Sequence, residues 1–238
     1  ESVLYRMERF VGGKANRLAL CAAADFLYKK SGQSLVITGS SSTGKTHLLK
    51  GVFYAWRPKK SAAYLSMSGF SESGFSVNIK KAKAELKKLY DKKLVCLDDL
   101  DAARGTPEIY DAVFHLFNAV TQKGGFLAFA MRRSPTPVSS PFLPDYLSSR
   151  LLSGMVTRLK KPAERDRKKI LKKLAEDVQL NLTPGALDYV LERAPRSIPD
   201  LANFLENLER SLSAEPKGGR RKRIGLQLIR RVITLMVS

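Results

Sequence analysis

The sequence predicts an α/β fold in which a five-stranded parallel sheet is flanked by helices and followed by a small helical unit. Short apolar runs alternate with longer amphipathic segments and occupy residues 35–38, 62–66, 94–97, 126–130 and 155–159. Near-continuous apolar runs of this length are typical of strands buried on both faces, and helical segments between most of them favour a parallel sheet. At 238 residues the chain can bury a full core and still carry an appendage.

The strand pattern stops at residue 163. Three helices are predicted beyond it, at residues 163–177, 184–192 and 197–212. We place the domain boundary near Lys161 and Pro162, which gives an α/β domain at 1–161 and a helical domain at 162–238. A loop at 215–219 is followed by the basic run 220–223 and by a last apolar helix or strand up to residue 238.

The first predicted strand leads into a glycine-rich loop with the sequence GSSSTGKT at residues 39–46. A bent loop at the start of a helix directs several backbone N–H groups at one point, and glycine lets the backbone approach a phosphate. A helix at 45–56 is consistent with a phosphate-binding loop before it, because Leu48, Leu49 and Val52 share one face. The alternative is a glycine-rich turn that binds nothing. The predicted nucleotide-binding residues of this segment are Gly39, Ser42, Thr43, Gly44, Lys45, Thr46 and His47.

Two residues of this loop have specific expected roles. Lys45 would meet the β- and γ-phosphates of ATP or ADP, and the Thr46 hydroxyl would be one ligand of Mg²⁺. His47 lies beside the loop, where a lone histidine more often packs or faces solvent than takes part in catalysis.

Two acids directly follow the third predicted strand. Acids at the carboxyl end of a central strand lie next to a phosphate loop, so Asp98 could hold Mg²⁺ through water and Asp99 could orient an attacking water. The alternative is a polar strand end that leads into a loop. The sequence therefore predicts Thr46 and Asp98 as metal ligands and Asp99 as a catalytic residue.

The chain is strongly basic, with 42 Lys and Arg against 22 Asp and Glu and a net charge of +20. An excess of this size favours a polyanionic partner, with nucleic acid ahead of an acidic membrane surface. Residues 80–93 hold seven lysines and residues 165–173 hold six basic residues, both with helical spacing. The first run follows an aromatic and glycine stretch at 69–75, which could stack bases, but a solvated helix face is the alternative.

Other features of the sequence favour a soluble, cytoplasmic protein, with association to the nucleoid left open. No apolar run is long enough to span a bilayer, and no signal-peptide pattern is present. Cys21 and Cys96 lie in apolar segments without metal-ligand spacing, so we expect two buried thiols. Because the chain begins at Glu1 without a methionine, we also expect that some native N-terminal residues are missing.

Five motifs, in their order along nearly the whole chain, resemble one family. They are FVGGKANRLA at 10–19, GKTHLL at 44–49, LVCLDDLD at 94–101, FHLFN at 114–118 and LPDYLSSR at 143–150. Together they resemble the AAA+ module of the DnaA family of bacterial replication initiators. The run DDLD, the LPD before SR, and the end of the chain soon after the helical lid resemble the Hda-like regulators of that family more closely.

The resemblance implies further site residues. Phe10, Val11 and Asn16 match the segment that covers adenine, although Phe10 and Val11 could equally be core residues. Arg150 matches the arginine finger, which reaches the γ-phosphate of a neighbouring subunit's nucleotide and can accelerate phosphoryl transfer strongly. An ordinary solvated arginine is the alternative at that position.

Two positions depart from the family pattern. Relatives carry an acid after the fourth strand, whereas this chain has Arg132 and Arg133. In the lid, relatives place a phosphate-contacting arginine where this chain has Pro199, with Arg196 three positions earlier. Since proline cannot supply a cation, we expect the chain to bind nucleotide better than it hydrolyses it, and ADP is a plausible resident ligand.

The resemblance implies a regulator of replication initiation. Such a regulator is tethered to the sliding clamp and promotes hydrolysis of the ATP that is bound to the initiator DnaA. Residues 1–4 do not match the clamp-binding peptide of relatives. The sequence shows no match to the family's helix-turn-helix domain, so we expect any DNA binding to be nonspecific and salt-dependent. Homo-oligomers through AAA+ interfaces are also implied. Two alternatives stay open, a nucleotide-gated adaptor for DNA or initiator, and an isolated initiator or helicase-loader ATPase module.

Overall fold

The computed structural model describes residues 10–11, 13–29, 32–56, 58–72, 76–195, 197–213 and 223–237. It divides into two compact units, Glu1–Lys161 and Pro162–Ser238. Residues 1–4, which do not match the clamp-binding peptide of relatives, lie outside the described residues. So do the loop at 215–219, Arg196 and most of the basic run 220–223.

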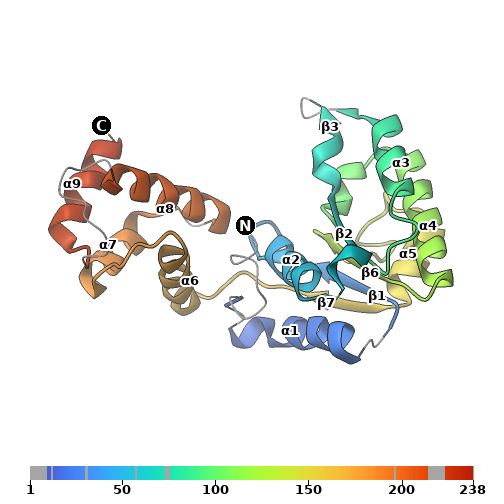
Figure 1. The fold of residues 1–238 in the computed structure, drawn as a ribbon, viewed down its shortest axis with the longest axis horizontal. Helices are drawn as coiled ribbons and strands as arrows, with labels where there is room; N and C mark the ends of the chain where they lie inside the picture. Colours follow the sequence, from blue (N-terminus) through green and yellow to red (C-terminus); the bar gives the residue numbers. More distant parts are fainter. Residues whose placement is uncertain are drawn as a thin grey trace. The chain divides into compact units, whose positions relative to one another are not determined.

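The first unit contains a five-stranded parallel sheet (Figure 1). Its order is β2-β5-β6-β1-β7, and every neighbouring pair is parallel. The strands are β1 (Ser34–Thr38), β2 (Ala62–Ser66), β5 (Leu94–Asp98), β6 (Phe126–Met131) and β7 (Met155–Arg158). All five predicted strands are thereby confirmed, with ends that differ by at most one residue.

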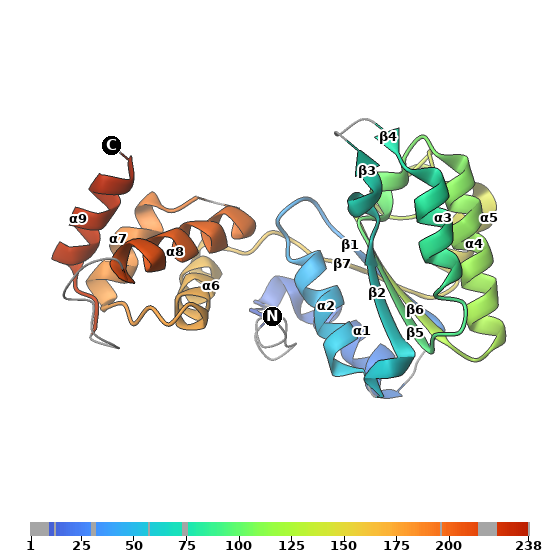
Figure 2. The ribbon, with the colours of Figure 1, turned by 45° about the horizontal axis from the view of Figure 1, so that its top comes forward.

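Helices cover both faces of this sheet. Figure 2 shows α1 (Arg17–Ala24) and α2 (Lys45–Ala55) on one side, and α3 (Ile79–Lys87), α4 (Pro107–Gln122) and α5 (Asp145–Leu152) on the other. The side chains of each strand alternate between these layers, as the pleat requires. Leu35 and Ile37 pack with the α1 and α2 layer, whereas Val36 packs with the layer of α3, α4 and α5.

A two-stranded antiparallel sheet between β2 and α3 was not predicted. It pairs β3 (Ser71–Glu72) with β4 (Ser76–Val77) and follows the short helix η5 (Met67–Phe70). Strands of two residues are too short to show any periodicity in the sequence. This segment includes the aromatic stretch at 69–75, where Phe70 is buried with the core and Phe75 lies outside the described residues.

The expectation of two buried thiols is wrong for one cysteine. Cys96 is buried within β5, but Cys21 is exposed, and both are free. Helix α1 turns only one side towards the sheet, where Ala19 and Ala23 are fully buried. The solvent side therefore carries Cys21 together with Leu18, which is 82% exposed, even though the local sequence is apolar.

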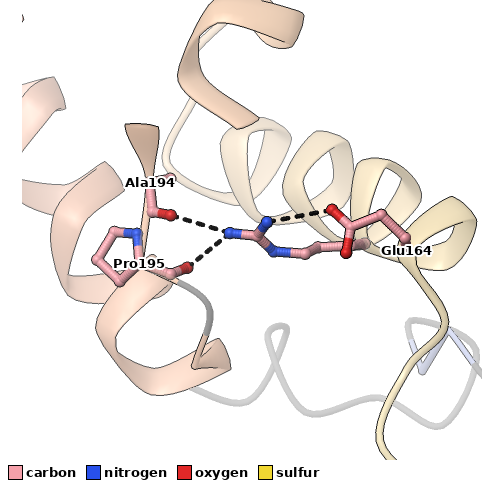
Figure 3. Close-up of polar contacts among 4 residues, drawn as sticks. Glu164, Ala194 and Pro195 are labelled. Carbon is pink, nitrogen blue, oxygen red and sulfur yellow. Dashed lines mark hydrogen bonds and ion pairs between the residues drawn. The ribbon is translucent and has the colours of Figure 1, made fainter. Parts of the chain in front are cut away.

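The second unit is helical, with a core of its own. It contains α6 (Glu164–Asp177), α7 (Pro184–Arg193), α8 (Ile198–Ser213) and α9 (Leu226–Val237), and α9 settles the open choice between helix and strand. Arg167 joins α6 to the end of α7 (Figure 3). Its guanidinium donates to the carbonyl oxygens of Ala194 (2.9 Å) and Pro195 (3.0 Å) and pairs with Glu164.

Within the described residues, none of the helices is both long and apolar enough to cross a membrane.

Candidate functional site

The candidate site lies at the carboxyl ends of three adjacent strands, β5, β6 and β1. Leu97, Phe129 and Val36 are aligned across these strands. The loop 39–44 follows β1, Asp98 ends β5 with Asp99 directly after it, and Arg132 follows β6. Because the strands are parallel, these three groups meet at the carboxyl ends of the strands, which is where open α/β sheets bind ligands.

The glycine-rich loop adopts a conformation that leaves no room for side chains at two positions. Gly39 has φ +153°, and a Cβ there would lie 2.6 Å from the Leu159 carbonyl oxygen. Gly44 has φ +94°, and a Cβ there would lie 2.9 Å from the Phe10 ring. Ser42 also has a positive φ of 60°. The backbone of this loop therefore stays close to its neighbours and open to a ligand, as a phosphate cradle requires.

Lys45 opens α2 and is 8% exposed. Its Nζ donates to the Ser40 carbonyl oxygen (2.9 Å), and the Thr43 hydroxyl donates to the same oxygen (2.9 Å). Burial lowers the pKa of Lys45, which shows that its charge is poorly solvated. Gly44, the N-cap residue of α2, has no side chain that could cap the first turn. A buried cation beside an uncapped helix N-terminus fits an anionic ligand such as phosphate.

Asp98 is 1% exposed, and both of its carboxylate oxygens accept hydrogen bonds. The Tyr64 hydroxyl donates to Oδ2 (2.7 Å), and the backbone N–H of Asp99 donates to Oδ1 (2.9 Å). Burial and the Asp98 charge raise the pKa of Tyr64 far above its ordinary range, so Tyr64 stays a donor. Asp98 is therefore fixed in orientation before any ligand binds.

Asp99 has the left-handed backbone conformation, with φ +53°, and is half-buried. Burial and the neighbouring Asp98 carboxylate raise the pKa of Asp99, whereas a hydrogen bond with Ser68 and the charges of Lys45 and Arg132 act in the opposite direction. Unfavourable backbone conformations of this kind concentrate at functional sites, where the surrounding structure must maintain them.

Arg132 lies beside the same charges. The β6 strand that it follows runs between the two strands that carry the loop and the acids. Its charge adds to the lowering of the Lys45 pKa that burial causes, and it also acts on Asp99. The structure therefore places a cation at the position after β6. Arg132 and Arg133 are both exposed, but of the two it is the Arg132 charge that acts on the pKa values of Lys45 and Asp99.

The residues expected to cover adenine differ from one another in their contacts. Phe10 packs on Gly44, and its ring makes an edge contact with the His47 ring at 5.5 Å between centroids. Asn16 is 4% exposed, and its amide forms two hydrogen bonds with the backbone of Lys160, at 2.8 and 3.0 Å. Asn16 therefore joins the N-terminal segment to the chain after β7. Val11 is half-buried.

Arg150 lies in the last turn of α5 and is exposed. A side chain that acts on another molecule must be accessible, and the exposure of Arg150 meets this requirement. Pro199 lies in the first turn of α8, where proline is readily accommodated because that backbone N–H needs no helical partner.

The two lysine- and arginine-rich runs, for which a solvated helix face was the alternative to DNA contact, differ from each other in structure. The helix α3 ends at Lys87, so the run 80–93 is only partly helical. Lys92 and Lys93 donate to the carbonyl oxygens of Lys60 and Lys123. The run 165–173 is helical, but Arg167 is directed into its own unit by the contacts described above. Lysines 80, 81, 83, 87 and 88 are exposed on or next to α3.

The donor set decides how a metal could bind. Among the described residues no group of three or more His, Cys, Asp and Glu side chains could hold a metal ion. Asp98 and the Thr46 hydroxyl supply hard oxygen donors of the kind that Mg²⁺ prefers, but they are too few to hold it alone. The residues therefore fit a magnesium ion whose remaining ligands are phosphate oxygens and water.

Sequence reasoning missed Tyr64 and Ser68, which contact the two acids. The pairing of β2 with β5, in which Ser66 lies opposite Asp98, brings Tyr64 and Ser68 close to the two acids. The polar residues in the second predicted strand were the available signal, since a strand buried on both faces is expected to be apolar.

Comparison with known proteins agrees with this geometry. The family model of the bacterial DnaA ATPase domain matches residues 2–158. Among curated proteins, the chain is similar to the chromosomal replication initiator protein DnaA of Synechococcus sp. (strain JA-2-3B'a(2-13)). The two are 27% identical over 207 residues, which is 84% of this chain and 44% of the relative. The chain therefore spans less than half the length of this relative.

Two solved structures are also similar. Domain III of the replication initiation protein DnaA from Thermotoga maritima has a TM-score of 0.78 and 22% identity, with 98% of this chain and 97% of that chain covered. A replication initiator DnaA bound to AMPPCP and single-stranded DNA has a TM-score of 0.67 and 26% identity, with 90% of this chain and 65% of that chain covered. The first likeness concerns the fold alone.

Proposed function

Because the chain belongs to the family of the bacterial DnaA ATPase domain, we propose that it is an adenine-nucleotide-binding AAA+ regulator of replication initiation of the Hda-like kind. In this proposal residues 1–161 are the nucleotide-binding domain and residues 162–238 are the lid. The regulator holds its own nucleotide and accelerates the hydrolysis of ATP bound to the initiator DnaA.

Nucleotide binding is supported by the loop 39–46 and its surroundings. The loop has no space for side chains at Gly39 and Gly44, and Lys45 is a buried cation directly beside it. Lys45 binds the phosphates in this proposal, in exchange for the Ser40 carbonyl oxygen that it now contacts. Phe10 and Val11 contact the base, and the relative that was solved with AMPPCP binds an adenine nucleotide analogue.

Mg²⁺ would be held by the Thr46 hydroxyl, by Asp98 through water, and by the phosphates of the nucleotide. When bound, the ion neutralises charge on the phosphate oxygens. Asp99 would orient the attacking water. Metal binding then depends on nucleotide, because the protein alone supplies too few ligands.

The observation that carries the proposal is the place of Arg132 directly after β6, between the strands that carry the phosphate loop and the acids, with its backbone N–H bonded to Asp101. A cation there attracts phosphate, and its charge also acts on Asp99, the acid that would orient water. We therefore assign a nucleotide that is bound firmly and hydrolysed slowly. The catalytic contribution comes instead from Arg150, which is exposed and acts on the nucleotide of the initiator.

The partners follow from this role. The initiator DnaA is the first, and the sliding clamp and the backbone of DNA are further proposed partners. The exposed lysines of α3 and the net charge of +20 support nonspecific contact with DNA. Such binding must weaken steeply as salt is raised, and an affinity that is unchanged between low and moderate salt would contradict it.

Three measurements of ATP turnover test the proposal, made with the protein alone, with DNA, and with initiator plus clamp. The proposal predicts slow turnover in the first two and stimulated hydrolysis in the third. Steady hydrolysis by the protein alone that Lys45→Ala abolishes would identify an ATPase module instead. Tight nucleotide binding without any stimulation would identify an adaptor that has lost catalysis.

A further inference from the structure

One short segment supplies hydroxyl groups to both acids of the site. Strand β2 is an edge strand of the sheet and pairs only with β5 among the described strands, with Tyr64 opposite Cys96 and Ser66 opposite Asp98. Tyr64 hydrogen-bonds to Asp98, and Ser68, just beyond the strand in η5, hydrogen-bonds to Asp99. The orientation of Asp98 is thus set in part from the neighbouring strand.

The Tyr64 ring is itself held in place. It lies against the Phe53 ring of α2, with centroids 6.0 Å apart, and Lys50 Nζ lies 5.5 Å from its centroid. Residues 50 and 53 belong to the helix that begins at the phosphate loop. Tyr64 therefore connects that helix with the acid of β5.

The hydrogen bonds leave Asp98 with acceptor capacity. Each carboxylate oxygen has two lone pairs, and Tyr64 and the Asp99 N–H use one on each oxygen. A neutral hydroxyl fixes the carboxylate without cancelling its charge, which a Lys or Arg partner would do. The remaining lone pairs can accept hydrogen bonds from water bound to a metal.

We propose that Tyr64 is a positioning residue that raises the affinity of the nucleotide-bound protein for Mg²⁺ by fixing the Asp98 carboxylate. This inference rests on the proposed nucleotide site. Without the hydroxyl, Asp98 must be ordered when the metal binds, and loss of such outer partners typically lowers metal affinity by about 10- to 100-fold.

The test compares the wild type with Tyr64→Phe, which removes only the hydroxyl and keeps the ring contact with Phe53. A fluorescent ADP analogue is titrated at a series of Mg²⁺ concentrations and in EDTA. We expect the Mg²⁺ midpoint of nucleotide binding to rise about tenfold, with the EDTA affinity unchanged. A merely structural role would weaken binding equally in both conditions. Tyr28→Phe, at a side chain that is 76% exposed, is the matched control.

A double-mutant cycle with Asp98→Asn identifies the route of the effect. Tyr64→Phe must add nothing to the Mg²⁺ midpoint once Asp98 is replaced, and additive shifts would overturn the inference. Equal midpoints in wild type and variant would overturn this inference alone, whereas a wild type that binds no nucleotide would overturn the proposed function as well.

Discussion

The backbone N–H of Arg132 donates a hydrogen bond of 2.5 Å to Oδ2 of Asp101. Asp101 lies in η6 (Leu100–Ala103), the short helix that follows the two acids of β5. This contact ties the end of β6 to the segment after β5. It fixes the backbone of Arg132, whose charge acts on Lys45 and Asp99.

Replacing Arg132 should weaken nucleotide binding. We expect Arg132→Gln to reduce ADP affinity by about 1.5 kcal/mol, or roughly tenfold, because a charge-assisted contact with phosphate is lost. Isothermal titration calorimetry measures the change. Arg133→Gln is the control, since Arg133 is also exposed and is the next residue. An equal loss in both variants would show that only the general surface charge matters.

Gly44 allows a test of the phosphate loop. Gly44→Ala places a methyl group 2.9 Å from the Phe10 ring at φ +94°, so Phe10 must move and nucleotide affinity should fall. Gly105→Ala has a similar φ of +86° with nothing within 4 Å of its Cβ, and it carries only the backbone cost of about 1–2 kcal/mol. Nucleotide titration of both variants separates loss of the cradle from loss of stability. Similar affinities in the two would contradict the Phe10 contact.

Asn16 should matter for stability. Asn16→Ala leaves the N–H and carbonyl oxygen of Lys160 without their side-chain partner, and we expect the free energy of unfolding to fall by about 2 kcal/mol. Chemical denaturation measures this loss. The exposed Asn181→Ala should change stability by less than about 0.5 kcal/mol. If Asn16→Ala were equally neutral, the contact with Lys160 would not contribute to the fold.

Arg167 should be irreplaceable by lysine in the helical unit. A guanidinium can reach Ala194, Pro195 and Glu164 together, whereas an ammonium is a point charge without this forked geometry. We expect Arg167→Lys to lower the free energy of unfolding by about 2 kcal/mol. Thermal unfolding followed by circular dichroism measures it, with the exposed Arg210→Lys as control. Equal melting temperatures would contradict the role shown in Figure 3.

Much of the fold was predictable because its signals are local. Strands buried on both faces, such as β1, are continuous apolar runs, and the phosphate loop has its own sequence pattern. The β3–β4 pair was not predictable, since two residues have no period. Exposure of Cys21 depends on which side of α1 meets the sheet, and the burial of Phe70 depends on tertiary packing.

The candidate site was predictable in part. The positions of Asp98 and Asp99 beside the loop follow from parallel strand order, which the sequence indicates. Tyr64 and Ser68 were missed because their contacts depend on the register between β2 and β5. The pairing of Asn16 with Lys160 joins residues 144 positions apart, so no local pattern could indicate it.

The most direct test of the proposed regulator is the hydrolysis of ATP bound to purified initiator, measured with clamp and DNA and with this protein as wild type or Arg150→Ala. The account predicts that the wild type accelerates hydrolysis, that Arg150→Ala does not, and that Arg210→Ala, at another exposed arginine in the last turn of a helix, behaves as wild type. Hydrolysis at the same rate with and without the wild-type protein, or acceleration that survives Arg150→Ala, would contradict it.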